Sequence, residues 1–351
     1  MITIHDVAKL AGVSIGTVSN VINQSNKVTP QTAEKVMDAI RELDYIPNTL
    51  AKSLKTNQSK VIGIIAEDVR AFSSGDIIDG ICAFFETYDY AINLCNLRVN
   101  AKAGLSFSYK ELEQSEDFKR SVKNAINILL TSRVCGLIYI GTHPRDVGNI
   151  LPRLDIPVVY TYAYTKNKDY CINYDDYQGA RLATEYLINM GHKKIAIICG
   201  TIDSVPSHKR MLGYQTSLME HNLSLYPEYV RTGNWHYEDG YNQCLELLNL
   251  KNPPSAIFSM SDLMAFGAIN AAADTGLSVP GDLSVHGFDN LEPTAYIRPE
   301  LTTIALPLFD LGFTSAQTML NILNNNAPDE HSILIPCSHV TRNTVSFYNK
   351  A

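Results

Sequence analysis

Charged, hydroxyl-bearing and aromatic side chains follow several short apolar runs of this 351-residue chain, and their chemistry suits the binding of a polar small molecule. A carboxylate beside an arginine takes pairs of hydroxyl groups, and an indole stacks on the face of a sugar ring. The set therefore predicts a sugar-binding site. The candidate ligand-binding residues are Glu67, Arg70, Phe72, Tyr162, Arg210, Trp235, Ser261 and Asp289.

Some of these positions have a purely structural interpretation as well. Ser261 and Asp262 begin a predicted helix, whose N-terminus they would cap. Asp68, Tyr164 and Asp262 fit helix caps or solvated loop groups as well as they fit ligand contacts. His192 follows a predicted helix end, where a cation is favourable, and indicates no catalytic role.

Seven apolar runs, separated by helical segments, must position these residues. This alternation is typical of parallel sheets covered by helices, and ligands of such sheets bind beyond the carboxyl ends of the strands. The two series of runs predict an α/β core of two doubly wound parallel-sheet subdomains. The polar segment 97–133 is longer than this pattern requires, which indicates an insertion plus a helix. The runs are 61–66, 91–96, 135–141, 156–162, 193–200, 255–260 and 283–288.

The beginning of the chain has the pattern of a helix-turn-helix. Thr3 and Asp6 have the spacing of a capping box, which predicts a first helix that starts directly after Thr3. Gly12 can adopt the left-handed conformation of a tight turn. Ser14 can cap a second helix, which buries Val18 and leaves its other face exposed. This packing of two short helices is what a helix-turn-helix requires.

A third helix and a hinge follow. Thr29 and Pro30 mark the cap and first turn of the third helix, which completes an all-α headpiece. Capped pairs of amphipathic helices also occur in proteins without a DNA partner. The stretch 45–54 favours DNA binding, because Pro47 ends the third helix and Asn48 can cap one more short helix. Such a helix needs DNA or a second copy of the chain to be stable.

With these motifs the chain resembles the lactose-repressor (LacI/GalR) family of bacterial transcription regulators, over nearly its whole length. The resemblance implies that hinge helices of two subunits, here at about 48–56, pair in the minor groove and insert Leu54 between base steps. It also places Ile15, Gly16 and Asn20 at base-reading positions in the major groove, where Ile15 could meet a thymine methyl and Asn20 an adenine. The predicted DNA-binding residues are Thr3, Lys9, Ser14, Ile15, Gly16, Thr17, Ser19, Asn20, Asn23, Leu54 and Lys55.

The resemblance also implies how the core is organised. The core would be periplasmic-binding-protein-like, with the chain crossing between its subdomains near Tyr174, Ile304 and residue 328. Arg210 would stand at the family's anchoring arginine, and Trp235 and Asp289 at neighbouring ligand positions. The expected domains are a headpiece of residues 1–58, an N-terminal core subdomain of 61–173 with 305–328, and a C-terminal core subdomain of 174–304 with 329–346.

Composition fits a cytoplasmic regulator. The net charge is −7, yet residues 1–58 carry six Lys or Arg against five Asp or Glu, so the remainder is acidic and would repel DNA. The seven cysteines lack metal-ligand spacing, and neither a metal nor another cofactor is expected. No signal peptide or apolar run of membrane-spanning length is apparent, so no membrane partner is expected.

We therefore expect a sequence-specific transcriptional regulator, a repressor of a carbohydrate-use operon, with a sugar effector bound between the core subdomains. A nucleobase or a phosphorylated sugar acting as corepressor is the alternative effector. A sugar-modifying enzyme is the alternative class, although no phosphate loop, nucleophile elbow or metal motif is found. The helix at 76–85 is apolar on more than one face, and the chain lacks a C-terminal leucine-heptad tail. Both features predict a homodimer on a pseudo-palindromic double-stranded operator.

Overall fold

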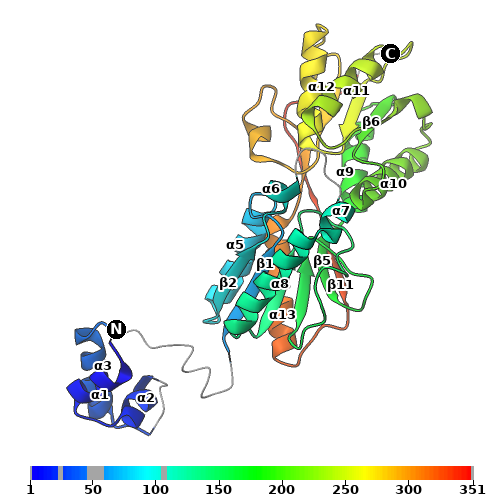
Figure 1. Ribbon diagram of the computed structural model, residues 1–351. Coiled ribbons are helices and arrows are strands. Elements are labelled where there is room, and N and C mark those ends of the chain that lie inside the picture. Colours follow the sequence, from blue (N-terminus) through cyan, green and yellow to red (C-terminus); the bar gives the residue numbers. More distant parts are fainter. Residues whose placement is uncertain (1, 23–26, 46–58, 104–108, 349–351) are drawn as a thin grey trace. The chain divides into compact units, whose positions relative to one another are not determined.

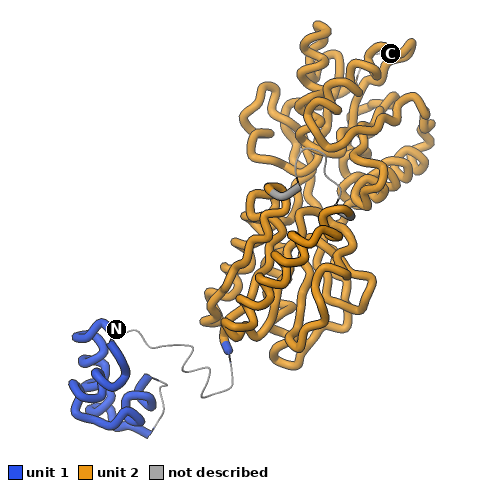
Figure 2. The backbone as a smooth tube through the Cα atoms, in the orientation of Figure 1, with its two compact units in different colours: residues 1–59 blue, residues 60–351 orange. Residues whose placement is uncertain are grey.

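The structure is a computed structural model that describes residues 2–22, 27–45, 59–103 and 109–348 (Figure 1). The chain divides into two compact units, Met1–Ser59 and Lys60–Ala351 (Figure 2). The predicted contacts Asn23, Leu54 and Lys55, and the hinge helix predicted at about 48–56, lie outside the described residues.

The first unit is a three-helix headpiece with the predicted turn. Its helices are α1 (Ile4–Ala11), α2 (Ile15–Ile22) and α3 (Pro30–Glu42). The Asp6 carboxylate accepts hydrogen bonds from the Thr3 amide at 2.8 Å and the Thr3 hydroxyl at 2.7 Å, so the helix starts where the spacing predicts. Gly12 ends α1 with φ 65°, a conformation that favours glycine. The small core joins all three helices through Val7, Ala8, Val18, Val36 and Ala39.

The second unit contains two α/β subdomains, and the larger is built on a six-stranded parallel sheet. Helices α5 (Ser74–Glu86) and α13 (Leu308–Leu323) pack on each other, and α8 (Glu116–Thr131) packs on a separate apolar cluster with this sheet. Two shorter helices, α6 (Val99–Ala103) and α7 (Tyr109–Gln114), precede α8. The strand order is β11 (Ser332–Ile335), β5 (Tyr170–Tyr174), β4 (Val158–Thr161), β3 (Gly136–Ile140), β1 (Val61–Ala66) and β2 (Ala91–Asn96).

The smaller subdomain has a four-stranded parallel sheet. Its strand order is β7 (Val230–Thr232), β6 (Ile195–Cys199), β8 (Ala256–Ser259) and β9 (Ser284–His286). Its helices are α9 (Asp176–Asn189), α10 (Val205–Glu220), α11 (Tyr237–Leu248) and α12 (Asp262–Asp274), with short 3-10 turns at Pro227–Tyr229 and Glu292–Ala295. The predicted fold class, a helix-turn-helix headpiece with a doubly wound two-part core, is confirmed.

One predicted subdomain boundary is wrong. The third crossing was expected near residue 328, but β11 pairs in parallel with β5 and is therefore the edge strand of the larger sheet. The chain crosses only after Ile335, and then forms β12 (Ser338–Val340), which pairs antiparallel with β10 (Thr303–Ala305). Two of the three crossing segments thus form a small ribbon between the subdomains.

Two glycines permit the closest helix contact in the larger subdomain. A Cβ atom at Gly312 of α13 would lie 1.9 Å from the carbonyl oxygen of Ile77, and one at Gly80 of α5 would lie 2.1 Å from that of Phe309. Only a residue without a side chain allows the backbones to approach so closely.

Among the described residues, no helix is both long and apolar enough to span a membrane.

Candidate functional site

A cavity of about 2300 Å³ lies where the carboxyl ends of strands from the two subdomains meet. It is larger than the usual range for small-molecule sites, about 300 to 1,000 Å³. Six of the eight predicted ligand residues line this central cavity: Phe72, Tyr162, Arg210, Trp235, Ser261 and Asp289.

Arg210 is the anchor of the wall formed by the smaller subdomain. It lies on α10, is only 3% exposed, and donates from Nε to the Asp176 carboxylate at 2.8 Å. It also donates to the hydroxyl of Tyr174 at 2.9 Å and to the carbonyl oxygen of Met260. Asp289 lies 3.9 Å away on the cavity side. The buried carboxylate therefore fixes the guanidinium, which leaves the looser Asp289 for a ligand.

Trp235 gives this wall an aromatic face. Its ring lies against Gly200, where a Cβ atom would be 1.9 Å from the indole, so the residue after β6 must be glycine. The indole nitrogen donates to the Thr201 hydroxyl at 3.1 Å, and the Arg210 guanidinium lies 5.5 Å from the ring centroid. These contacts hold the ring in one orientation, as a stacking platform requires.

Three cavity residues have left-handed backbone. The φ angles are 55° at Tyr162, 72° at Trp235 and 120° at Asp289. Such a conformation costs a non-glycine residue about 1 to 3 kcal/mol and clusters at functional sites. Seven further non-glycine residues with positive φ lie outside the cavity lining, so the strain marks turns of the described chain as well as this site.

Burial governs ionisation on this wall. It raises the pKa of Asp289 well above the usual value, against the opposing effect of Arg210, and the nearby carboxylate of Asp262 raises it further. Burial likewise raises the pKa of Asp262 to about 7, although Thr303 and the Leu291 amide donate to its oxygens at 2.6 and 2.7 Å. Asp262 does not line the cavity, so the structural interpretation holds for it.

The opposite wall contains an ion pair that was not predicted. Arg145, in the loop after β3, donates to both oxygens of Glu67 at 2.6 and 2.7 Å. Tyr139 donates to the same carboxylate at 2.5 Å, and Thr142 donates from its amide and its hydroxyl at 2.9 Å each. Burial raises the pKa of Glu67 most, but Arg145 and these hydrogen bonds together hold it below the usual 4.5.

Glu67 and Arg70 are the two predicted ligand residues that do not line the cavity. Glu67 is fully buried and its carboxylate accepts hydrogen bonds from Arg145 and Thr142, so it affects the cavity by positioning these two residues. The backbone amide of Arg70 donates to the Asp68 carboxylate at 3.0 Å, and Arg70 is exposed and is not one of the residues that line the cavity. Phe72, which is 50% exposed, is the residue of this loop that reaches the cavity.

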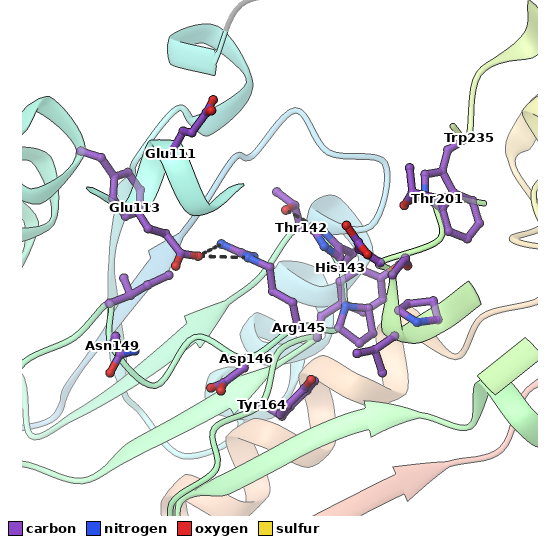
Figure 3. A pocket seen from close by; sticks show the side chains of 18 of the residues that line it. Glu111, Glu113, Thr142, His143, Arg145, Asp146, Asn149, Tyr164, Thr201 and Trp235 are labelled. Carbon is purple, nitrogen blue, oxygen red and sulfur yellow. Dashed lines mark hydrogen bonds and ion pairs between the residues drawn. The ribbon is translucent and has the colours of Figure 1, made fainter. Parts of the chain in front are cut away.

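The loop after β3 supplies the residues that sequence reasoning missed. Figure 3 shows Thr142, His143, Arg145 and Asp146 at the centre of the cavity wall. The rule applied to the other strands, that ligand residues follow the carboxyl end, would have pointed to them directly after the run 135–141. Burial lowers the pKa of His143 to about 4, and Arg145 adds to that effect, so the imidazole is neutral near pH 7.

The headpiece presents the predicted base-reading residues on α2. Val18 is fully buried, whereas Ile15 is 39% exposed and Gly16 is exposed at the start of the helix. Ser14 accepts a hydrogen bond from the Thr17 amide at 3.1 Å and so caps α2. Thr3, the cap of α1, and Lys9 within α1 are exposed. Ser19 and Asn20 in α2 are half-buried. No group of three or more potential metal ligands occurs in the part of the chain that the structure describes.

Comparison with known proteins agrees with both units. Residues 3–48 match the model for bacterial regulatory proteins of the lacI family, and residues 184–345 match a periplasmic binding protein-like domain. The HTH-type transcriptional repressor PurR of Histophilus somni (strain 129Pt) is 33% identical, with 98% of this chain and 99% of that protein covered.

Solved structures agree over the same length. The Lac repressor dimer bound to operator and the anti-inducer ONPF has a TM-score of 0.80 and 30% identity, covering 98% of this chain and 99% of that one. A complex of the transcriptional regulator CelR with cellobiose has a TM-score of 0.66 and 25% identity, covering 98% and 100%.

A helix-turn-helix headpiece joined to a two-part core with a central cavity defines a DNA-binding transcriptional repressor with an effector-binding domain. The similarity to such repressors extends from end to end of the chain. The chain belongs to the lacI family of bacterial regulatory proteins.

Proposed function

We propose that the protein represses a carbohydrate-use operon and that a sugar bound in the central cavity controls its affinity for the operator. The observation that carries the sugar proposal is the Arg210–Asp289 pair beside the Trp235 ring. A guanidinium and a carboxylate can take neighbouring hydroxyl groups while the indole covers the apolar face of the ring. The complex of CelR with cellobiose supports a saccharide in a core of this type.

The charges in the cavity favour a neutral effector over a phosphorylated sugar. Arg210 faces the carboxylates of Asp176 and Asp289, and Arg145 faces those of Glu67 and Glu113. Each guanidinium therefore already has two carboxyl neighbours. The cavity lining holds five Lys or Arg and five Asp or Glu, so it offers a phosphate no excess of positive charge.

On the DNA side, we propose that α2 of each of two subunits enters the major groove of one half of a pseudo-palindromic operator. Ile15, Gly16 and Asn20 would read base edges, and the other predicted contacts would hold the backbone. Leu54 and Lys55 belong to this proposal as the central minor-groove contacts. The solved dimer of Lac repressor on its operator supports a two-fold assembly.

A nucleobase is the second candidate effector, because the similarity to PurR repressors covers nearly the whole chain. The Trp235 face could stack on a base as well as on a sugar. A sugar and a nucleobase differ in what they require of Arg210 and Asp289, since only the sugar presents several pairs of hydroxyl groups.

The single tryptophan makes the proposal testable. We expect a saccharide, from a panel of saccharides, sugar phosphates and nucleobases, to change the Trp235 emission in a saturable way and to raise the melting temperature. Asp289→Asn should weaken that response by about tenfold or more without affecting operator binding, since a lost hydrogen bond to a charged group costs about 1.5 to 3 kcal/mol. Asp329→Asn, an exposed carboxylate away from the cavity, is the matched control. A response to nucleobases alone would replace the sugar by the second candidate.

A further inference from the structure

The helix α7 lies between β2 and α8, in the segment 97–133 for which an insertion was predicted, and it forms part of the cavity wall. Glu111, Glu113 and Gln114 line the cavity, whereas Leu112 between them is only 8% exposed and packs into the apolar cluster beneath α8. Ser115 then caps α8 by accepting from the Phe118 amide at 3.3 Å. The chain is therefore anchored on both sides of Glu113, by the buried Leu112 and by the Ser115 cap.

Glu113 lies beside Arg145, next to the ion pair that Arg145 forms with Glu67. Its Oε1 atom is 3.4 Å from Nε and 3.3 Å from a terminal nitrogen of Arg145. These distances are longer than the 2.6 and 2.7 Å to Glu67, and the Glu113 side chain is 26% exposed, against 0% for Glu67. Burial raises the pKa of Glu113 more than Arg145 lowers it, which agrees with a loose pair.

The Arg145–Glu113 pair has the same arrangement of contacts as the Arg210–Asp289 pair on the opposite wall. In both, a buried carboxylate fixes the guanidinium from behind, and a buried tyrosine hydroxyl joins the same network: Glu67 with Tyr139, and Asp176 with Tyr174. In both, a second carboxylate lies more than 3 Å from the guanidinium on the cavity side. Figure 3 shows Arg145 between Glu113 on one side and Thr201 with Trp235 on the other.

We propose that Arg145 and Glu113 form a second hydroxyl-recognising pair, and that the effector is a saccharide of at least two rings that contacts both pairs. This inference rests on the proposed sugar-binding function. A loose guanidinium–carboxylate pair offers one donor edge and one acceptor to neighbouring hydroxyls. The cavity of about 2300 Å³ provides the room that a second ring needs. The helix α7 thereby acquires a role, which is to select effectors by length.

The test compares Glu113→Gln with Glu111→Gln in the full-length protein by titration calorimetry. The matched control lies on the same helix and also lines the cavity, but no ion pair joins Glu111 to Arg145 among the described contacts. The probes are the disaccharides cellobiose, maltose, lactose, melibiose and trehalose, together with glucose and galactose. We expect at least one disaccharide to bind more tightly than either monosaccharide. Glu113→Gln should reduce that affinity about tenfold or more and leave the monosaccharide affinities unchanged.

The outcomes separate this inference from the proposed function. If a disaccharide binds and Glu113→Gln has no effect, or weakens monosaccharides equally, the second pair is refuted while sugar binding stands. If glucose or galactose binds as tightly as every disaccharide, the length requirement is refuted. If no saccharide binds the wild-type protein, the proposed sugar function and this inference both fail. An unchanged melting temperature of Glu113→Gln without ligand would show that the variant is folded.

Discussion

Both cavity arginines are held by a buried carboxylate that does not itself line the cavity. Glu67 receives five hydrogen bonds, two of them from Arg145, and Asp176 receives the Nε–H of Arg210. Removing one partner of a buried ion pair leaves the other charge uncompensated in a medium of low polarity. The carboxylates that hold the two arginines in place are therefore also positions at which a substitution should destabilise the fold.

We predict that Glu67→Gln lowers the free energy of unfolding of the core by about 3 to 5 kcal/mol, as expected for a broken buried pair. Urea denaturation near pH 7 measures it. Glu116→Gln, whose partner Lys119 is 56% exposed, should change the stability little. An equal effect of the two substitutions would contradict the role assigned to Glu67.

The same variant has a predictable pH dependence. The pKa of Glu67 is below 4.5 in the folded protein, so its stabilising contribution is complete above that pH and is lost as the pH falls through the folded value. The stability difference between wild type and Glu67→Gln should therefore shrink in acid. A difference that stays constant down to pH 2 would argue against an ionised Glu67.

At the residue scale the sequence predicted which side chains lie at strand ends, but not which of them face the cavity. Glu67 and Phe72 follow the same strand, yet one is fully buried and the other is half exposed. That difference depends on Tyr139 and Arg145, which are more than 70 residues away in the chain. No local pattern contains such a pairing.

At the scale of elements, α2 is the one on which DNA recognition is proposed to depend. We predict that Asn20→Ala costs about 1 to 3 kcal/mol of binding to the operator and little on unrelated duplexes, because it removes a base contact. Lys9→Ala should weaken all duplexes alike and reduce the salt dependence by about one phosphate contact. Measuring the affinity of each variant for DNA by fluorescence anisotropy at several salt concentrations distinguishes the two effects. Equal losses for Asn20→Ala on operator and scrambled DNA would remove it from the reading surface.

Elements were predictable where the pattern is local. Caps and glycine turns predicted α1 to α3, and short apolar runs predicted β1 and β2 with their observed bounds, although β2 is a partly exposed edge strand. Strands β5 and β11 were missed, because Asn173 interrupts the apolar pattern of β5 and β11 is a half-exposed edge strand. These two strands pair although they lie about 160 residues apart in the chain. A pattern confined to a short stretch of sequence cannot predict such a pairing.

At the scale of the whole molecule, an aromatic patch on α5 and α13 suits the proposed homodimer. Phe309 and Phe313 are 41% and 38% exposed, and Phe313 packs edge-on against Phe84. We predict that Phe313→Glu shifts the protein from dimer to monomer in light scattering at micromolar concentration. It should also weaken operator binding, because the two half-sites are no longer bound by one linked molecule.

Phe347→Glu is the matched control, since Phe347 is 60% exposed on the smaller subdomain. It should leave the oligomeric state unchanged. A dimer that persists in Phe313→Glu would move the interface away from the aromatic patch.

The late position of β11 has a consequence for biosynthesis. The larger subdomain begins at β1, yet its sheet is complete only when Ser332–Ile335 pairs with β5. A ribosome must therefore make nearly the whole chain before this subdomain can close, and until then the edge of β5 is open to other strands. Most of the smaller subdomain is encoded within that interval, but its last segment follows β11, since the Val285 amide donates to the carbonyl oxygen of Thr344 and Val345 belongs to its core. Premature termination before residue 332 would release a chain with an exposed sheet edge, a target for chaperones and proteases rather than a shortened repressor.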